Sequence, residues 1–285
     1  MSPEGWFPSS GLGLSLMGHW LEPEATRRVA RRADALGFCL ILVDGRAAEY
    51  PKRAARYVDP SASHFETGLD GLERARVGSI QLPPLWDAGQ LAASLATKRG
   101  SGGGGAVGFF GVGDAGRTAG ELAPGARVRW LDRELSRLRD ELRRRDTRVP
   151  LIVAARGPRA MRVVDRHADL WDANVAPTRA RLEQARTHLT RRVETCLWIF
   201  ARPNQPWEEA SHEYRLRSPW FADLPPGEIR NAVLWGEERR CRDRIEALRS
   251  ELEIDLPILD LAGLEEADCL AALEALAPAE PREMA

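Results

Sequence analysis

The sequence is poor in cysteine and contains no long apolar run. Its four cysteines are far apart and lack the spacing of metal ligands: Cys39, Cys196, Cys241 and Cys269. We therefore expect free thiols and a reducing, cytoplasmic location. No apolar stretch is long enough to cross a bilayer, and the first residues lack the basic and apolar regions of a signal peptide. The sequence thus predicts no membrane partner.

An excess of charge of either sign is also missing. The 41 basic side chains are offset by 42 acidic ones, for a net charge of −1. Nucleic-acid-binding proteins depend on neutralising phosphates, so we expect no nucleic-acid partner. Arginine far outnumbers lysine, which we interpret as a bias of genome composition. The 285 residues suit one large α/β domain or two small ones.

Several enzyme signatures are absent as well. No G-x-G-x-x-G with an acidic residue about twenty positions later follows a predicted strand, which argues against a Rossmann dinucleotide site. The sequence contains no P-loop and no G-x-S-x-G elbow. Phosphate-loop nucleotide hydrolysis and serine-elbow hydrolysis are therefore not predicted.

Short apolar runs alternate with amphipathic segments along the whole chain. We expect strands at 11–16, 38–43, 75–82, 106–112, 151–154, 170–175, 193–200 and 256–261, with helices between them. Eight such units predict an α/β fold, a single (β/α)8 TIM barrel over residues 1–285, with a doubly wound open sheet as the alternative. Residues 228–252 are predicted to be mostly helical, split at Gly236. The segment at about 203–227 is expected to be irregular, as a lid or an added helix, and the C-terminal tail to be frayed.

Residues 150–174 are the most informative segment, because their pattern predicts a strand, a tight turn, a helix and a second strand. Gly157 closes the strand, and Pro158 fits the first position of a helix, where its missing N–H has no partner to lose. Free N–H groups at a helix start, with Arg156 adjacent, can hold a phosphate. The alternative is an ordinary strand-to-helix turn of an α/β protein.

Several motifs occur in an order and spacing that resemble one family. They are Ala-Asp-Ala-Leu-Gly-Phe at 33–38, Leu-Glu-Arg-Ala-Arg-Val-Gly at 72–78, Ser-Gly-Gly at 101–103, Gly-Val-Gly at 111–113, Ala-Ala-Arg-Gly-Pro at 154–158, Ala-Asp-Leu-Trp at 168–171 and Leu-Trp-Gly at 234–236. Together they resemble the luciferase-like flavin- and deazaflavin-dependent oxidoreductases, a superfamily of TIM barrels.

The resemblance implies a cofactor at the C-terminal ends of the strands, either reduced FMN or the 8-hydroxy-5-deazaflavin coenzyme. The third strand would carry a bulge with a non-proline cis peptide at Ser79–Ile80, which supports the ring of the cofactor. Further cofactor contacts would come from residues after the fourth and fifth strands: Gly111, Gly113, Asp114, Arg156, Gly157 and Pro158. The last three would hold part of the phosphate tail.

The sequence also departs from the family pattern. Asp44–Gly45 stands where members often have Asp-His, and glycines at 102–105 replace an arginine that can pair with phosphate. These losses favour two alternatives to a flavin enzyme. The chain would then be a degenerate barrel that serves as a partner subunit or small-molecule-binding protein, or a barrel that does cofactor-free chemistry.

Two residues remain as candidates for catalysis. His19 follows the first strand, and histidine titrates near working pH, so it can act as an acid or base. The alternative is a surface or helix-capping histidine. Asp44 ends the second strand and either binds cofactor or substrate or hydrogen-bonds a loop. Tryptophans at 171, 198, 207, 220 and 235 line a pocket or pack in the core.

The first functional hypothesis is therefore an FMN-dependent monooxygenase or a deazaflavin-dependent oxidoreductase. Its substrate would be a small organic molecule, such as a biosynthetic intermediate. The resemblance implies a flavin reductase that supplies reduced FMN, and a homodimer or heterodimer. The protein would position the substrate and the cofactor in a pocket that excludes water, and the cofactor would carry out the redox chemistry.

Overall fold

The computed structural model describes residues 5–16, 21–43, 69, 72–81, 86–97, 105–111, 123–173, 178–217 and 225–278. Its strands all run parallel in one sheet. They are β1 (Gly13–Leu16), β2 (Leu40–Val43), β3 (Arg76–Gln81), β4 (Gly105–Gly111), β5 (Leu151–Ala154), β6 (Leu170–Asp172), β7 (Glu194–Pro203), β8 (Val233–Gly236) and β9 (Leu256–Asp260).

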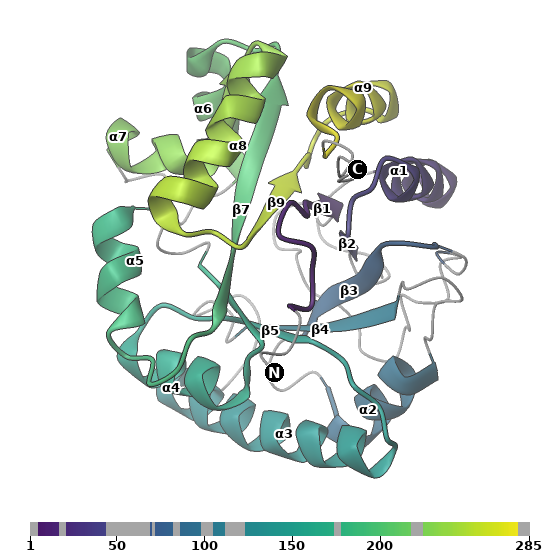
Figure 1. Cartoon of the computed structure of the whole chain (residues 1–285), viewed down its shortest axis with the longest axis vertical. Coiled ribbons are helices and arrows are strands. Elements are labelled where there is room, and N and C mark those ends of the chain that lie inside the picture. The colour runs from purple at the N-terminus through teal and green to yellow at the C-terminus, as the bar shows by residue number, and fades with distance from the viewer. Residues whose placement is uncertain are drawn as a thin grey trace, which may run out of the picture.

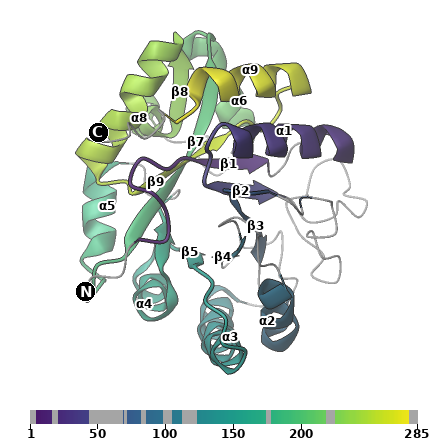
Figure 2. The same ribbon diagram turned by 45° about the vertical axis from the view of Figure 1, so that its right-hand side comes forward.

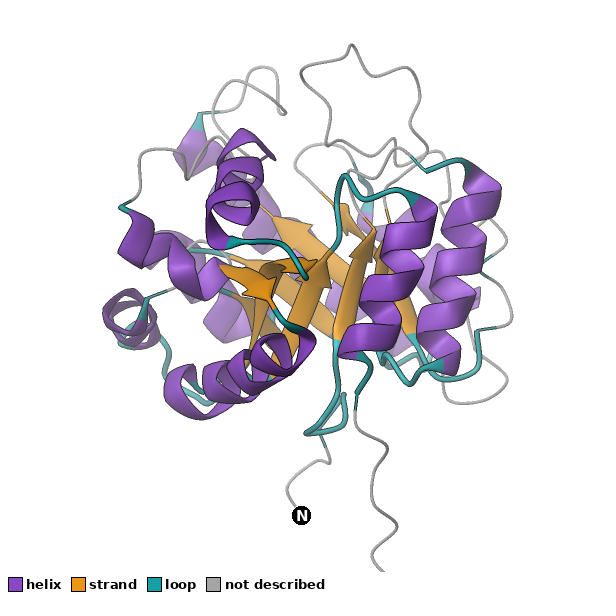
Figure 3. Cartoon of the chain, turned by 90° about the horizontal axis from the view of Figure 1, so that it is seen from above, coloured by secondary structure: helices purple, strands orange, loops and turns teal. Residues whose placement is uncertain are grey.

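Eight of these strands close into a barrel. β1 to β7 pair in chain order, and β9 then pairs with β7 on one side and with β1 on the other. The strands form the central ring in Figure 3, with helices outside it. This confirms the predicted (β/α)8 TIM barrel, and it excludes the open doubly wound sheet because the strand order closes on itself.

Helices follow most of the strands and cover the outside of the barrel (Figure 1). They are α1 (Pro23–Ala35), α2 (Ala88–Thr97), α3 (Pro124–Arg144), α4 (Pro158–His167), α5 (Arg179–Arg186), α6 (Trp207–Arg217), α7 (Pro226–Ile229), α8 (Glu238–Leu252) and α9 (Glu266–Leu276). Residues 44–68, where a helix is expected between the second and third predicted strands, fall outside the described residues. No helix in the described part of the chain is both long enough and apolar enough to cross a membrane.

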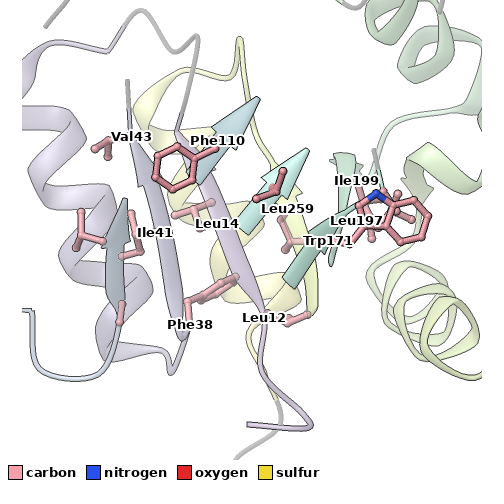
Figure 4. Close-up of a cluster of buried hydrophobic side chains, with 14 of the residues drawn as sticks. Leu12, Leu14, Phe38, Ile41, Val43, Phe110, Trp171, Leu197, Ile199 and Leu259 are labelled. Atoms are coloured by element: carbon pink, nitrogen blue, oxygen red, sulfur yellow. The ribbon is translucent and has the colours of Figure 1, made fainter. Parts of the chain in front are cut away.

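The main hydrophobic core lies between the barrel wall and these helices. Outward-facing strand residues such as Leu14, Ile41, Phe110 and Leu259 pack there against apolar helix side chains (Figure 4). The strands are apolar on both faces, as expected for a parallel sheet covered on both sides. The apolar runs in the sequence therefore predicted the strands well.

A second, smaller core fills the lower part of the barrel. It consists of Cys39, which directly precedes β2, and of strand residues that point inward: Leu40, Leu42, Val107, Phe109, Ile152, Leu170, Cys196, Leu256 and Ile258. Packing at this level is tight, because a β-carbon on Gly78 would lie 2.3 Å from Cγ1 of Val107. Trp6 and Phe7 pack against the same cluster near the N-terminus.

One prediction was wrong at residues 233–236. The sequence predicted a mostly helical segment over 228–252, but Val233–Gly236 forms β8, which pairs with residues 200–203 of β7. Gly236 adopts a φ of +81°, so the chain turns there before α8 begins at Glu238. The predicted split at Gly236 is therefore real, but it separates a strand from a helix.

A third cluster surrounds β8 and lies beside the barrel. It joins the upper half of β7 to α6, α7 and β8 through Phe200, Tyr214, Ile229, Val233 and Trp235. The tryptophan-rich segment at about 203–227, predicted to be irregular or to form an added helix, contains α6 and the start of α7. Its described part thus follows the second of those alternatives.

Candidate active site

The C-terminal ends of the strands form a polar rim on the inner face of the barrel. Side chains alternate between the two faces of a strand, and the register places six residues near these strand ends on the same face as the inner core. These are Ser15, Gly111, Ala154, Asp172, Phe200 and Asp260. In TIM-barrel enzymes the active site lies at this end of the barrel. Three of the six, Ser15, Gly111 and Ala154, have small side chains.

Trp198 lies just below this rim, in the middle of β7. Its ring packs against Phe109 of β4, with ring centroids 5.7 Å apart. The residue is only half-buried although strands surround it. Its Nε1 is buried and has no hydrogen-bond partner. Buried indole N–H groups normally find an acceptor, so this unsatisfied donor requires an explanation.

Two carboxylates of the rim, Asp172 and Asp260, were not predicted as site residues. Asp172 is buried at the end of β6, opposite Cys196 of β7. Burial raises the pKa of the Cys196 thiol well above its usual value, and the charge of Asp172 raises it further. Asp260 ends β9 and accepts a hydrogen bond from the N–H of Ala262 at 2.9 Å. Both residues could have been identified from the sequence, because each is an acidic residue at the end of a short apolar run.

All four cysteines are buried free thiols. Burial raises the pKa of Cys39 to about 12 and of Cys241 to about 11. It also raises the pKa of Cys269 to about 12. A thiol is a nucleophile only as the thiolate, so none of these cysteines is suited to nucleophilic catalysis. The described residues include no group of three or more metal-binding side chains.

The turn between β5 and α4 lies at the same end of the barrel. Gly157 is the N-cap of α4, and Pro158 occupies the first helical turn, as predicted. No side chain caps this helix start, so the N–H groups of Arg159 and Ala160 are available to an anion. A β-carbon on Gly157 would meet nothing within 4 Å, which leaves space beside the turn. Arg156 is exposed.

β3 shows no bulge at Ser79–Ile80 along the edge that pairs with β4, although the sequence predicted one there. The ladder between β3 and β4 runs without interruption from Arg76 to Gln81, with Ser79 opposite Gly108 and Ile80 opposite Phe109. The backbone along this edge is therefore a regular strand, because a bulge would place two residues opposite one.

The other predicted site residues divide into two groups. Gly111 ends β4 opposite Ala154 of β5, on the inner face of the barrel, where it was predicted to contact the cofactor. The remaining ones, which are His19, Asp44, Gly113 and Asp114, lie outside the described residues. The structure therefore brings Gly111 and the 156–158 turn to one end of the barrel, together with the unpredicted Trp198.

Comparisons with known proteins identify similar folds and no similar sequences. No family model matches the sequence, and no curated protein matches it. An F420-dependent secondary alcohol dehydrogenase in complex with an F420–acetone adduct is similar in structure, with a TM-score of 0.72 at 15% identity. The similarity covers 94% of this chain and 98% of that one.

Two oxygenases are also similar. EDTA monooxygenase from Chelativorans sp. BNC1 has a TM-score of 0.67 at 11% identity, covering 94% of this chain and 92% of that one. The oxygenating constituent of 3,6-diketocamphane monooxygenase from the CAM plasmid of Pseudomonas putida, in complex with FMN, has a TM-score of 0.62 at 12% identity. That similarity covers 94% of this chain and 96% of that one. At such identities the likeness concerns the fold alone: this chain shares its (β/α)8 barrel fold with these three enzymes.

Proposed function

We propose that this protein is an oxidoreductase that binds reduced FMN or the 8-hydroxy-5-deazaflavin coenzyme at the C-terminal end of its barrel. The observation that carries the proposal is the unsatisfied indole N–H of Trp198 on the inner face of the barrel, together with the uncapped start of α4 at the C-terminal end of the strands. An aromatic floor suits a planar ring system, and free helix N–H groups suit a phosphate. Of the structurally similar enzymes, one is in complex with an F420–acetone adduct and another with FMN.

The residues on the inner face of the barrel suit such a cofactor in their chemistry. Gly111 and Ala154 lie opposite each other there and have little side-chain bulk. The indole N–H can donate a hydrogen bond to a carbonyl oxygen or ring nitrogen. The N–H groups of Arg159 and Ala160, with Arg156 beside them, would hold the phosphate.

The chain's own residues would bind and orient the reacting groups and exclude water from them. The apolar inner core below the rim excludes water from beneath the site. When bound, the cofactor supplies either oxygen activation, with reduced FMN, or hydride transfer, with the deazaflavin. The substrate we propose is a small organic molecule that enters from the rim. With FMN, a separate flavin reductase would supply the reduced cofactor, and the chain would act as a homodimer or heterodimer.

A barrel that has lost turnover is the second candidate. It is favoured by the regular β3–β4 ladder at Ser79–Ile80, where flavin-binding relatives would have a bulge. Such a chain would serve as a partner subunit or as a small-molecule-binding protein, or it would do cofactor-free chemistry in the same space. It would keep the fold and the open barrel end without holding the cofactor ring.

A fluorescence titration distinguishes these candidates. The purified chain is titrated with oxidised FMN, reduced FMN and the deazaflavin coenzyme, under anaerobic conditions for the reduced form. We expect micromolar binding of at least one of them, with quenching of tryptophan emission because the ring lies near Trp198. Absence of binding for all three would overturn the oxidoreductase proposal and leave the second candidate.

A further inference from the structure

Residues 5–11 cross the end of the barrel that is opposite to the candidate active site. They contact Arg76, Arg148 and Glu194, which lie at or just before the first residues of β3, β5 and β7. The N-terminal ends of the parallel strands all lie at this lower end of the barrel. Figure 2 shows the segment as the purple coil that leads into β1, beside β7 and β9. Residues 5–11 are called the strap below.

Trp6 anchors the strap to the barrel. The guanidinium carbons of Arg76 and Arg148 each lie 5.5 Å from the centroid of its ring. Together with Phe7, the ring also packs against the inner core of the lower barrel. A cation placed over an aromatic face is attracted to it, and more strongly where water is excluded. Trp6 therefore joins the strap both to the inner core and to the starts of two strands.

The two ends of the strap meet β7 and α8. A β-carbon on Gly5 would lie 2.8 Å from Oε1 of Glu194, so the backbone runs directly over the start of β7. At the other end, Arg249 of α8 donates to the carbonyl oxygen of Ser9 at 2.9 Å and to that of Gly11 at 2.6 Å. The strap therefore reaches from one side of the lower barrel to the other.

The strap is held less firmly than the strands that it covers. Its backbone forms no helix or strand, and the N–H of Gly11 closes a turn by donating to the carbonyl oxygen of Pro8 at 2.8 Å. Trp6 and Phe7 are only half-buried, and residues 8–10 are exposed. Segments with few buried contacts and an exposed backbone open at a lower free energy than core strands do. The strap is thus the part of the lower barrel that opens most easily.

A buried thiol lies directly beneath the strap. Cys39 belongs to the inner core that Trp6 covers, and a β-carbon on Gly11 would lie 2.7 Å from its Sγ. Burial raises the pKa of Cys39 to about 12, so the thiol reacts with reagents only after it has become exposed. Cys241 and Cys269 lie instead in α8 and α9, in the core outside the barrel wall. Cys39 therefore reports on the strap, and the two helix cysteines report on the rest of the fold.

We propose that the strap is a gate, which opens by local unfolding around Trp6 and admits water and small molecules to the lower barrel while the rest of the fold stays closed. Trp6 is the latch of this gate, because its ring makes the contacts with the inner core and with both arginines. The proposal does not depend on the proposed function, since the strap lies at the other end of the barrel. Without the ring the strap would open more often, but the strands would keep their pairing.

Thiol labelling of the native full-length chain tests the gate. The protein is exposed to N-ethylmaleimide for increasing times, and mass spectrometry of its peptides gives the labelling rate of each cysteine. In W6A we expect Cys39 to be labelled roughly ten- to a hundredfold faster, because the core and cation–π contacts of the ring are lost. The rates at Cys241 and Cys269 should stay within about twofold of the wild type. W207A removes a half-buried tryptophan of the outer cluster and should leave the rate at Cys39 unchanged.

A milder variant tests the latch while the ring stays in place. R148Q removes one of the two cations at Trp6, and we expect it to speed the labelling of Cys39 about two- to fivefold. R145Q removes an exposed arginine three residues earlier and should not change that rate. In the double variant W6A/R148Q the second substitution should add nothing to the effect of the first, because Arg148 acts through the ring.

The pattern over the cysteines decides between a gate and a merely structural segment. Unchanged labelling of Cys39 in W6A would overturn the proposal, as would labelling of Cys39 in the wild type at the rate of a free thiol. Equal acceleration at all four cysteines would show that Trp6 stabilises the whole fold, which also overturns a local gate. Should W6A fail to fold, R148Q and R145Q decide: faster labelling of Cys39 alone in R148Q supports the gate, and equal rates in the two variants refute it.

Discussion

Trp198 and Phe109 form the aromatic floor of the upper barrel, and the indole N–H of Trp198 has no acceptor. The relationship is notable because Trp198 is the only site residue here that combines an inward position, partial exposure and an unused donor within the described part of the chain. It marks the boundary between the packed lower barrel and the rim of Ser15, Asp172 and Asp260. The account of the site therefore depends on this residue.

The substitution W198F keeps an aromatic ring and removes the N–H donor. We expect cofactor affinity to fall by up to about tenfold, which corresponds to one hydrogen bond. The fold should remain, because the ring contact with Phe109 is preserved. W207F changes a tryptophan of the outer cluster and should leave the affinity unchanged. Fluorescence titration of both variants checks the prediction, and equal affinities in W198F and the wild type would contradict it.

An ion pair between a buried arginine and a partly exposed glutamate links the end of β7 to α6. Arg202 is fully buried, and its Nε donates to Oε2 of Glu213 at 2.8 Å. Its remaining donors bind the carbonyl oxygens of Ala201 and Ala262. E213A removes this carboxylate from a fully buried guanidinium, so we expect the free energy of unfolding to fall by about 3 kcal/mol. Urea denaturation measures this change.

The control for the ion pair comes from the same helix. Glu209 is exposed in α6, and E209A should change the free energy of unfolding by less than about 0.5 kcal/mol. Similar losses in E213A and E209A would mean that the Arg202–Glu213 pair contributes little to stability.

Gly78 is required by the packing of the lower barrel. A β-carbon there would lie 2.3 Å from Cγ1 and 2.8 Å from the carbonyl oxygen of Val107, and backbone cannot move aside easily. G78A should therefore destabilise the protein by about 3 kcal/mol or fail to fold. Gly227 has nothing within 4 Å of the same position, so G227A should melt close to the wild type. Thermal melting compares the two, and a stable G78A would refute the barrel packing.

His167 makes the stability depend on pH. Its Nε2 lies 2.9 Å from Asp132, but burial lowers its pKa below the usual value and outweighs that contact. The unfolded chain, with a pKa near 6.5, then binds the proton more readily than the native state. The stabilisation is present above about pH 6.5 and is lost as the pH falls through the window below it.

Urea unfolding at pH 8 and at pH 5.5 tests this dependence. We expect the wild type to lose more free energy of unfolding between the two values than H167Q, which keeps a polar side chain and cannot titrate. H212Q changes an exposed histidine and should behave as the wild type. If H167Q and the wild type lose the same amount, the lowered pKa of His167 is not the cause.

The sequence predicted the segment from β5 to β6 almost residue by residue. Gly157 and Pro158 mark the end of the strand and the start of the helix, and the apolar run at 151–154 has no competing helical pattern. The local sequence preferences therefore agree with the fold. β8 was missed because its four residues, Val233–Gly236, lie between helices and are too short to show a period. A strand of that length is identified by its partner, which is the upper half of β7.

The inner rim was not predictable for a related reason. Ser15, Asp172 and Trp198 share one face only because of the register between strands, and register depends on contacts between distant segments. The sequence indicates which residues end a strand, but not which of them point inward.

The central claim is that a flavin or deazaflavin binds at the C-terminal end of the barrel. A crystal structure of the chain with the cofactor that binds most tightly in solution tests this most directly. The account predicts the ring system above Trp198 and the phosphate against the N–H groups of Arg159 and Ala160. A cofactor bound elsewhere on the protein, away from Trp198 and the start of α4, would contradict it.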